Sequence, residues 1–162
     1  MFLKPFFFGI IAAGGALVLE LLFSDFLPEY NFSAGILSLS TFFLLMLMAA
    51  IEEFFKLLII YKSLYSPKND TPRFLFSALF LGLGFSLTEI FISNYDGISK
   101  NSGFYLGISG IIVIHTFLSG LIGWLLLKIK TINFSTMAVV LFVTTLLHFT
   151  YNIAVFLGLL QK

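Results

Sequence analysis

Long apolar runs separated by short polar segments constrain the fold of this chain more than any other feature of its sequence. A helix crosses the hydrocarbon core of a bilayer with about 20 mostly apolar residues, and a helical segment pairs all of its own backbone polar groups. Mean hydropathy is +1.06, and only 10% of the residues are charged, against about 25% in soluble domains. We therefore expect an all-α, polytopic membrane protein with about five transmembrane helices, at residues 6–23, 33–61, 74–94, 104–127 and 134–160.

The rest of the composition narrows the class of protein. The predicted spans occupy most of the 162 residues, so we expect one transmembrane helical domain over residues 1–162 and no separate soluble domain. Cysteine is absent, which excludes disulfide and thiolate chemistry. The net charge of +1 gives no reason to expect a nucleic acid as a partner. The expected surroundings of the chain are a lipid bilayer.

Lysine and arginine in the short loops predict the orientation of the chain in a cell membrane, because such residues gather on the inner side. With the N-terminus inside and the C-terminus outside, only Lys100 and Lys162 fall on the outer side. Six basic residues then fall on the inner side: Lys4, Lys62, Lys68, Arg73, Lys128 and Lys130.

The second predicted span carries three ionisable residues close together. In the stretch AAIEEFFKLLII, Glu52, Glu53 and Lys56 interrupt an otherwise apolar run. An ionisable residue at the centre of a membrane helix costs roughly 2.5–3.5 kcal/mol, so such residues are rare and usually functional. In a helix Lys56 lies one turn from both glutamates and can reach either carboxylate. The alternative is an interfacial cluster whose side chains extend to water.

Polar side chains also occur in the other spans. Glu89 lies in the third, His115 in the fourth, and His148 and Asn152, one turn apart, in the fifth. Each is costly alone in lipid, but together they can satisfy one another around a polar intramembrane cavity. Glu89 lies nearer the outer end of its predicted span, while Glu52 lies nearer the inner end of its own. Tilt of the long second helix, or an extension of the third past Asn94, must bring them level. Glu20, near the end of the first span, is expected at the membrane interface, or else as an accessory group facing the cavity.

These residue types suit the hydrolysis of an amide bond. A carboxylate can act as general base on a water molecule, and histidine and asparagine can donate hydrogen bonds to the oxyanion that develops. The same set could hold zinc, for which glutamate and neutral histidine are good ligands. We expect a metal-free site driven by glutamate. If a metal is present, we expect zinc on Glu52, Glu89, His115 and His148.

Four short motifs, taken in order, resemble those of the PrsW family of intramembrane proteases. They are EEFFK at residues 52–56, FSLTE at residues 85–89, His115, and HFTYN at residues 148–152. The PrsW family is related to the CAAX prenyl proteases and the bacteriocin-processing enzymes. This chain differs from the CAAX relatives in two ways. Lys56 stands one residue closer to the glutamate pair than their arginine, and Glu89 stands where they have a histidine. These differences argue against a prenylated substrate.

The resemblance implies an all-helical membrane enzyme that hydrolyses peptide bonds. Its implied substrates are membrane proteins with a transmembrane segment, anti-sigma factors among them. Position by position, the resemblance implies that Glu52 is the general base for water. It also implies that Glu53 and Lys56 are the orienting partners of Glu52.

The resemblance assigns the remaining polar residues as well. Glu89 would share the water molecule or shuttle its proton. His148 and Asn152 would bind the oxyanion, while His115 would line the cavity as a donor or ligand.

Two other functions remain open from the sequence. Residues 107–110 (GISG) resemble the GxSG motif of rhomboid serine proteases, with Ser109 as nucleophile and His148 as base. In rhomboids, however, the HxxxN motif precedes the serine, and small-residue packing explains the glycines more simply. Buried glutamate and histidine also form proton relays, so a proton-coupled membrane carrier or a non-catalytic membrane partner protein is the second alternative. The lack of a clear internal repeat argues against a transporter built from repeated halves.

Overall fold

The computed structural model describes residues 3–24, 38–65, 71–93, 102–129 and 131–157. The helices of these ranges are α1 (Leu3–Ser24), α2 (Leu39–Ile59), α3 (Thr71–Ser93), α4 (Ser102–Lys128) and α5 (Phe134–Phe156), with α2 continued by a π-helical turn, η1 (Ile60–Leu64). No β-strand occurs in the described ranges. The predicted all-α class is therefore confirmed.

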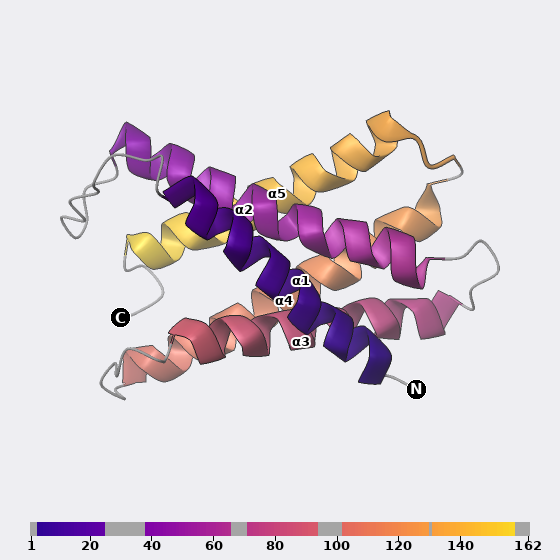
Figure 1. Ribbon diagram of the computed structural model, residues 1–162, viewed down its shortest axis with the longest axis horizontal. Helices are drawn as coiled ribbons and strands as arrows, with labels where there is room; N and C mark the ends of the chain where they lie inside the picture. The colour runs from indigo at the N-terminus through magenta and orange to yellow at the C-terminus, as the bar shows by residue number, and fades with distance from the viewer. Residues whose placement is uncertain (1–2, 25–37, 66–70, 94–101, 130, 158–162) are drawn as a thin grey trace.

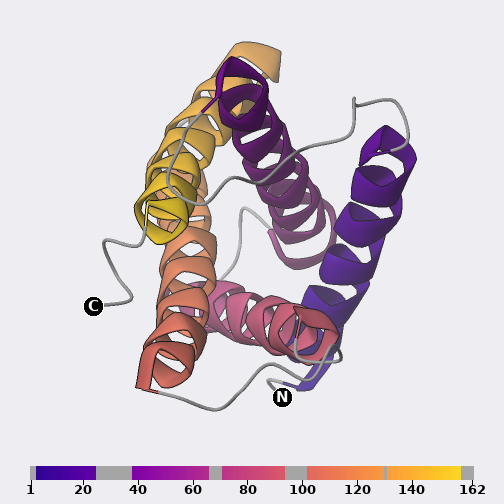
Figure 2. The same cartoon turned by 90° about the vertical axis from the view of Figure 1, so that its left-hand side faces the viewer.

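The helices form an up-and-down bundle (Figure 1). Each helix runs opposite to the one before it along the long axis of the molecule, so the N-terminus and the C-terminus lie at opposite ends. Figure 2, which looks along that axis, shows the helices arranged as a ring. Around this ring α1 packs on α3, α3 on α4, α4 on α5, α5 on α2, and α2 on α1.

Between the helix ends the surface of the bundle is mainly apolar, and charged residues of α2 lie in its interior. Helices α1, α3, α4 and α5 are long and apolar enough to cross a membrane. Helix α2 has a similar length of 21 residues but carries three charged residues. Phe91 and Phe134, on different helices, are 74% and 90% exposed, whereas Glu53 and Lys56 are completely buried. Apolar side chains outside and polar side chains inside are the arrangement that lipid requires. The chain is thus a multi-pass membrane protein.

Local sequence signals fix the starts of two helices. The Asn133 side chain accepts a hydrogen bond from the Thr136 backbone N–H over 2.9 Å, and the Thr136 hydroxyl accepts one from the Asn133 backbone N–H over 2.9 Å. This reciprocal capping starts α5. Ser38 caps α2 by accepting from the Thr41 backbone N–H over 3.1 Å.

The helix ends differ from the predicted spans by a few residues. Helix α1 starts at Leu3 rather than residue 6, α3 starts at Thr71 rather than residue 74, and η1 carries the second span to Leu64 rather than residue 61. Helix α5 ends at Phe156, before the predicted residue 160. The predicted start of the second span, residue 33, lies outside the described residues. Hydropathy marks where an apolar segment ends, whereas backbone hydrogen bonds and caps decide where a helix ends.

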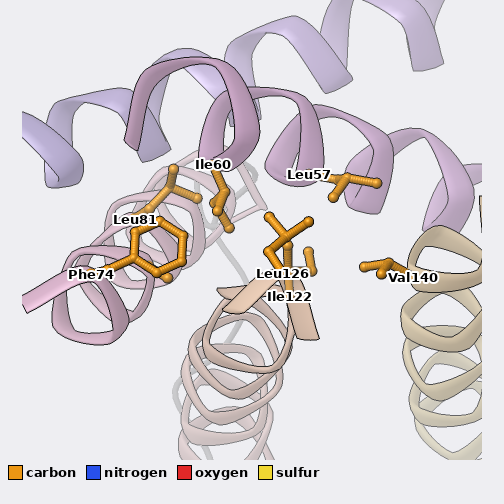
Figure 3. Packing of buried hydrophobic residues seen from close by; sticks show 8 residues of the cluster. Leu57, Ile60, Phe74, Leu81, Ile122, Leu126 and Val140 are labelled. Carbon is orange, nitrogen blue, oxygen red and sulfur yellow. The ribbon is translucent and has the colours of Figure 1, made fainter. Parts of the chain in front are cut away.

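An apolar core fills the half of the bundle in which α1 and α3 begin and α4 ends, and Figure 3 shows its side chains. It is built from the end of α2, η1, the start of α3, the end of α4 and the start of α5. Its buried members are Leu57, Ile60, Phe74, Ala78, Leu81, Ile122, Leu126 and Val140. A smaller apolar group joins α1, α2 and α3, and its members are Ala12, Ala13, Ala16, Ile51 and Phe85. The larger of the two apolar groups therefore fills the interior of the bundle at the end where α1 and α3 begin.

Candidate active site

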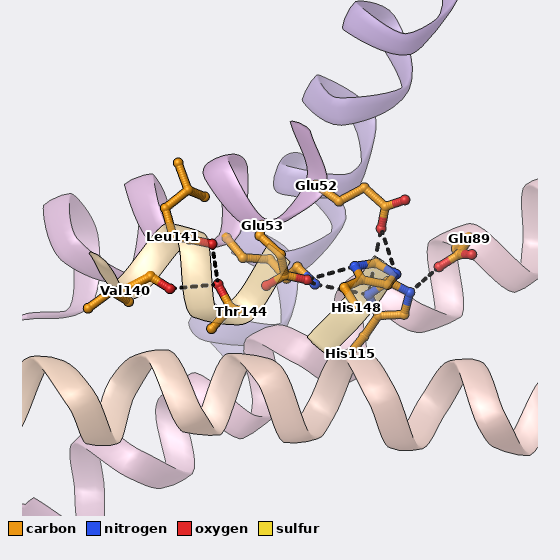
Figure 4. Close-up of polar contacts among 9 residues, drawn as sticks. Glu52, Glu53, Glu89, His115, Val140, Leu141, Thr144 and His148 are labelled. Carbon is orange, nitrogen blue, oxygen red and sulfur yellow. Dashed lines mark hydrogen bonds and ion pairs between the residues drawn. The ribbon is translucent and has the colours of Figure 1, made fainter. Parts of the chain in front are cut away.

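Polar side chains from α2, α3, α4 and α5 meet in the middle of the bundle (Figure 4), and those of α2, α4 and α5 are buried whereas Glu89 of α3 is 36% exposed. Glu53 and Lys56 are fully buried, His115 and His148 are at most 2% exposed, and Glu52 is 9% exposed. Contacts described below also join Glu89 to this group. The structure thus brings together six of the seven residues singled out from the sequence, and their individual roles stay predictions.

Glu53 is the acidic partner of Lys56. The Lys56 Nζ donates to Glu53 Oε1, and His148 Nδ1 donates to the same oxygen over 2.8 Å. Charge-assisted hydrogen bonds of this kind allow a carboxylate to stay buried. The sequence left open which glutamate Lys56 reaches, and the structure assigns it to Glu53. Glu53 therefore holds the His148 ring in a fixed orientation. Glu52 takes no part in these two hydrogen bonds.

Glu52 faces both imidazole rings. Its Oε2 lies 3.8 Å from His115 Nδ1 and 3.9 Å from His148 Nε2, and both distances are too long for hydrogen bonds. This oxygen is buried and accepts no hydrogen bond from the described part of the chain. A buried carboxylate oxygen without a donor is costly. Glu52 Oε2 is therefore available to a water molecule, a metal ion or a substrate group.

His115 is held from three directions. Lys56 Nζ donates to His115 Nδ1 over 3.0 Å, and His115 Nε2 contacts Glu89 Oε2. The Phe85 ring stacks on the imidazole with centroids 4.9 Å apart, and Lys56 Nζ lies 4.8 Å from the Phe85 centroid. Because a lysine ammonium only donates, Nδ1 accepts and Nε2 carries the proton that faces Glu89. Phe85 was not among the expected site residues, although its spacing of one turn from Glu89 is a signal that it shares the same helix face.

A glycine sets the position of His115 relative to α3. A Cβ atom at Gly82 would lie 2.5 Å from the His115 carbonyl oxygen and 2.7 Å from Thr116 Cα. The backbones of α3 and α4 reach this distance only because residue 82 has no side chain. Phe85 and Glu89 follow one and two turns along α3. The close approach of the two helices brings their side chains level with the His115 ring, although Glu89 lies near the end of α3.

A cavity of about 260 Å³ lies between α1, α2 and α3. Glu52 and Glu89 line it, so the cavity and the polar cluster share two residues. Glu20 from α1 also lines the cavity. Of the two positions expected for Glu20, the structure therefore supports the one that faces the cavity rather than the membrane interface.

Two residues considered from the sequence, Asn152 and Ser109, are less buried than the members of the cluster. Asn152 is half-buried on α5, one turn after His148, and makes no hydrogen bond to the cluster within the described part of the chain. Ser109 is exposed on α4, six residues or about 9 Å of helix rise before His115. The contacts of His148 go to Glu52 and Glu53. The serine-protease alternative therefore gains no support from the structure.

Glu52, His115 and His148 have the geometry to hold a metal ion, since one ligand atom from each lies within 4.8 Å of the others. The ligands of a tetrahedral zinc ion lie about 3.4 Å apart. The separations of 3.8 and 3.9 Å from Glu52 Oε2 therefore have to contract, as does the separation of the two histidine ligand atoms where it exceeds this value within the 4.8 Å limit. His148 is well prepared because Glu53 fixes its Nδ1 proton and leaves Nε2 as the ligand atom. His115 must give up the contact of its Nδ1 with Lys56 to become a ligand, because Nδ1 is the nitrogen that faces Glu52. With that exchange, the residues fit a metal ion.

A family model described as PrsW family intramembrane metalloprotease matches residues 1–161. The chain belongs to this family. Neither the curated proteins nor the solved structures compared with it gave a match. Membership of the PrsW family is thus confirmed. The wider relation to the CAAX prenyl proteases and the bacteriocin-processing enzymes stays a prediction.

Membership of the PrsW family makes this chain an intramembrane protease, a hydrolase of peptide bonds. The family is described as one of metalloproteases, and the structure contains a glutamate–histidine–histidine group of suitable geometry. The metal-free site that we expected from the sequence stays a prediction.

Proposed function

We propose that this PrsW-family protein is an intramembrane endopeptidase in which Glu52, His115 and His148 hold a catalytic zinc ion. The substrate would be a membrane protein with a transmembrane segment, of which an anti-sigma factor is one example. The observation that carries the proposal is the buried Glu52 Oε2, which faces two imidazole nitrogens at 3.8 and 3.9 Å and accepts no hydrogen bond from the described residues.

Bound zinc would supply a Lewis acid that polarises the scissile carbonyl and lowers the pKa of a water molecule. The residues of the chain would orient the ligands, balance charge and transfer the proton. Glu53 holds the His148 ring through its Nδ1 proton, and Lys56 balances the charge of Glu53. Glu89 lines the cavity beside Glu52, so its carboxylate is placed to take a proton from the attacking water and pass it to the departing amide nitrogen.

Asn152 is our candidate for an oxyanion donor. It follows His148 by one turn on α5, so the two side chains lie on the same face of the helix. An amide NH₂ donates without bringing a further charge into the membrane. Its half-buried position lets a substrate carbonyl reach it, whereas the fully buried His148 is committed to the cluster.

A mechanism without metal is favoured by one observation. Both ring nitrogens of His115 already have partners, since Nδ1 accepts from Lys56 and Nε2 contacts Glu89. In this arrangement His115 has no lone pair for a metal, and Glu52 would itself act as the general base for water. The peptidase function is the same in both mechanisms, but the requirement for metal differs.

Metal analysis together with a cleavage assay separates the possibilities. The protein would be purified in detergent and mixed with a reporter peptide that contains one transmembrane segment. We expect about one zinc per chain, loss of cleavage after chelation, recovery on adding zinc, and loss of both zinc and cleavage in Glu52→Gln. Phe54→Leu, on the exposed face of the same helix turn, is the matched control and should behave as wild type.

Other outcomes would change the proposal in defined ways. Cleavage that survives chelation in metal-free protein, and is lost in Glu52→Gln, would assign the base to Glu52 without metal. Cleavage that survives in Glu52→Gln would remove Glu52 from the chemistry. A zinc-loaded protein that cleaves no reporter but moves protons across vesicles would support the carrier alternative.

We also propose that the N-terminus lies inside the cell membrane and the C-terminus outside. Lys4, Lys62, Arg73 and Lys128 all belong to helix ends on the side of the bundle where the N-terminus lies (Figure 1). Because the chain has no cysteine, single cysteines can be introduced without background. Lys62→Cys in intact cells should resist a membrane-impermeant thiol reagent and react once the cells are opened. Labelling in intact cells would instead show that the N-terminus lies outside and the C-terminus inside.

A further inference from the structure

Three carboxylates line the cavity between α1, α2 and α3. Glu52 and Glu89 belong to the candidate active site, whereas Glu20 comes from α1 and makes no contact with the two histidines among the interactions found in the described residues. No lysine or arginine is among the described residues that line the cavity. The one buried lysine of the described chain, Lys56, is bound to Glu53 and His115. Acidic groups therefore outnumber basic groups among the described residues that line the cavity.

The side chains of Glu20 and Glu52 are prepared for an outside donor. Glu20 Oε1 is buried and accepts no hydrogen bond from the described part of the chain, and the same holds for Oε2 of Glu52, a residue only 9% exposed. Glu20 is also not one of the three residues, Glu52, His115 and His148, whose geometry would allow them to hold a metal ion. A buried acceptor without a donor is costly, so Glu20 is placed for a hydrogen-bonding group that enters the cavity.

The size and the walls of the cavity indicate what enters. A volume of about 260 Å³ lies just below the range of roughly 300–1,000 Å³ typical of small-molecule pockets, so it suits one long side chain rather than a folded segment. Leu17, Met48 and Ile92 give it apolar walls. A lysine or arginine matches this combination, because its aliphatic stem packs on apolar walls while its charged end meets a carboxylate.

The depth of Glu20 agrees with a basic side chain. Glu20 lies four residues before the end of α1 at Ser24, which is about 6 Å of helix rise. Lysine and arginine of transmembrane segments are found near helix ends rather than at the centre of the bilayer. A substrate span that enters beside α1 can therefore place a basic residue level with Glu20.

We propose that the cavity between α1, α2 and α3 is a specificity pocket that receives a lysine or arginine side chain of the substrate next to the scissile bond, and that Glu20 binds its charged end. The proposal rests on the proposed peptidase function, because the pocket shares Glu52 and Glu89 with the candidate active site. Glu20 is a specificity-determining residue in this arrangement and takes no part in the chemical step.

A charge-swap experiment tests the pocket. The reporters are single-span peptides in which one residue at a time, along the last two turns of the span, is lysine, leucine or glutamate, and the products are mapped by mass spectrometry. Wild type should cleave the best lysine reporter with kcat/KM higher by about tenfold or more than the matching leucine reporter, the size expected for a hydrogen bond between charged groups. Glu20→Gln should lose this preference but keep cleavage of the leucine reporter. Glu20→Lys should prefer the glutamate reporter.

Controls keep this test separate from that of the peptidase function. Leu22→Ala changes a side chain that is 56% exposed on the same helix turn and should retain the lysine preference. Glu20→Asp keeps the charge and should retain part of it. Binding of the lysine and leucine peptides to inactive Glu52→Gln, and to Glu52→Gln combined with Glu20→Gln, gives a second measurement that needs no cleavage. Only the Glu52→Gln protein, which keeps Glu20, should bind the lysine peptide more tightly than the leucine peptide.

Cleavage without any preference for the basic reporters, or a preference that Glu20→Gln retains, would overturn the pocket and leave the peptidase function intact. If no reporter is cleaved, the peptidase function is the one in question, and the binding measurement decides the pocket. Equal binding of the lysine and leucine peptides to the inactive Glu52→Gln protein would then overturn the proposed specificity pocket.

Discussion

Replacing Gly82 with alanine tests whether the contact between α3 and α4 positions His115. The new Cβ would lie 2.5 Å from the His115 carbonyl oxygen and 2.7 Å from Thr116 Cα, whereas ordinary van der Waals contact begins at 3.4 Å. Both contacts are with α4 backbone rather than with the end of a flexible side chain. The two helices must therefore separate by about 0.9 Å, which is the difference between the 3.4 Å of ordinary contact and the 2.5 Å found here.

The separation should affect activity more than stability. Moving α4 by this amount carries the His115 ring away from Glu89 on α3 and from Lys56 on α2. A misplacement of about 1 Å in a catalytic group can lower the rate by about 10²-fold, while overpacking costs about 1–3 kcal/mol of unfolding free energy. We expect kcat/KM of Gly82→Ala to fall by roughly 30- to 100-fold, with a modest decrease in Tm.

The assay is cleavage of a single-span reporter by protein purified in detergent, with thermal unfolding measured on the same sample. Gly14→Ala is the neutral control, because nothing lies within 4 Å of a Cβ at that position. Gly123→Ala is the packing control. Its Cβ would meet Ala78 Cβ at 2.9 Å in the same interface, about 12 Å of helix rise from His115. It should lower Tm without lowering kcat. If Gly82→Ala cleaves at the wild-type rate, or if Gly123→Ala loses as much activity, the positioning role of Gly82 is wrong.

Three further substitutions test the cluster and the oxyanion site. Lys56→Ala should lower the free energy of unfolding by about 3–5 kcal/mol and reduce cleavage, because Glu53 would remain buried without its cation; an unchanged unfolding curve would contradict this. Glu53→Gln should weaken zinc binding by about 10–100-fold by releasing the His148 ring, which titration with a competing chelator would detect. Asn152→Ala should lower kcat by about 10²–10³ with Tm nearly unchanged if Asn152 donates to the oxyanion. A lower Tm with normal kcat would instead show that Asn152 only links helices.

The sequence predicts most of the fold because lipid leaves few choices. A run of about 20 apolar residues in a membrane has to be helical, so the number and order of the helices follow from the apolar runs. The ends are less predictable. Hydropathy does not report the π-helical turn that carries α2 on to Leu64, nor the caps at Ser38 and Asn133.

The meeting of the polar side chains is also predictable from the sequence, since Glu89, His115 and His148 would each be costly in lipid alone. Their depths are not predictable. Glu89 lies only four residues before the end of α3, and it reaches His115 because Gly82 lets the backbones of α3 and α4 touch. The sequence contains that glycine, but only the packed structure shows which carbonyl and Cα it faces.

The sequence by itself determines that this is a helical membrane protein and that its few ionisable side chains must gather inside the bundle, because the energetic penalty in lipid applies to each one separately. Tertiary structure decides which side chain meets which. Glu52 and Glu53 are both within reach of Lys56 on the same helix, but adjacent residues on a helix point about 100° apart, so the rotation of α2 decides which neighbouring side chains each glutamate meets. Packing fixes that rotation. Glu53 then meets His148 while it also binds Lys56, and Glu52 faces the two histidines. The packing of α1 on α2 and α3 places Glu20 in the same cavity as Glu52.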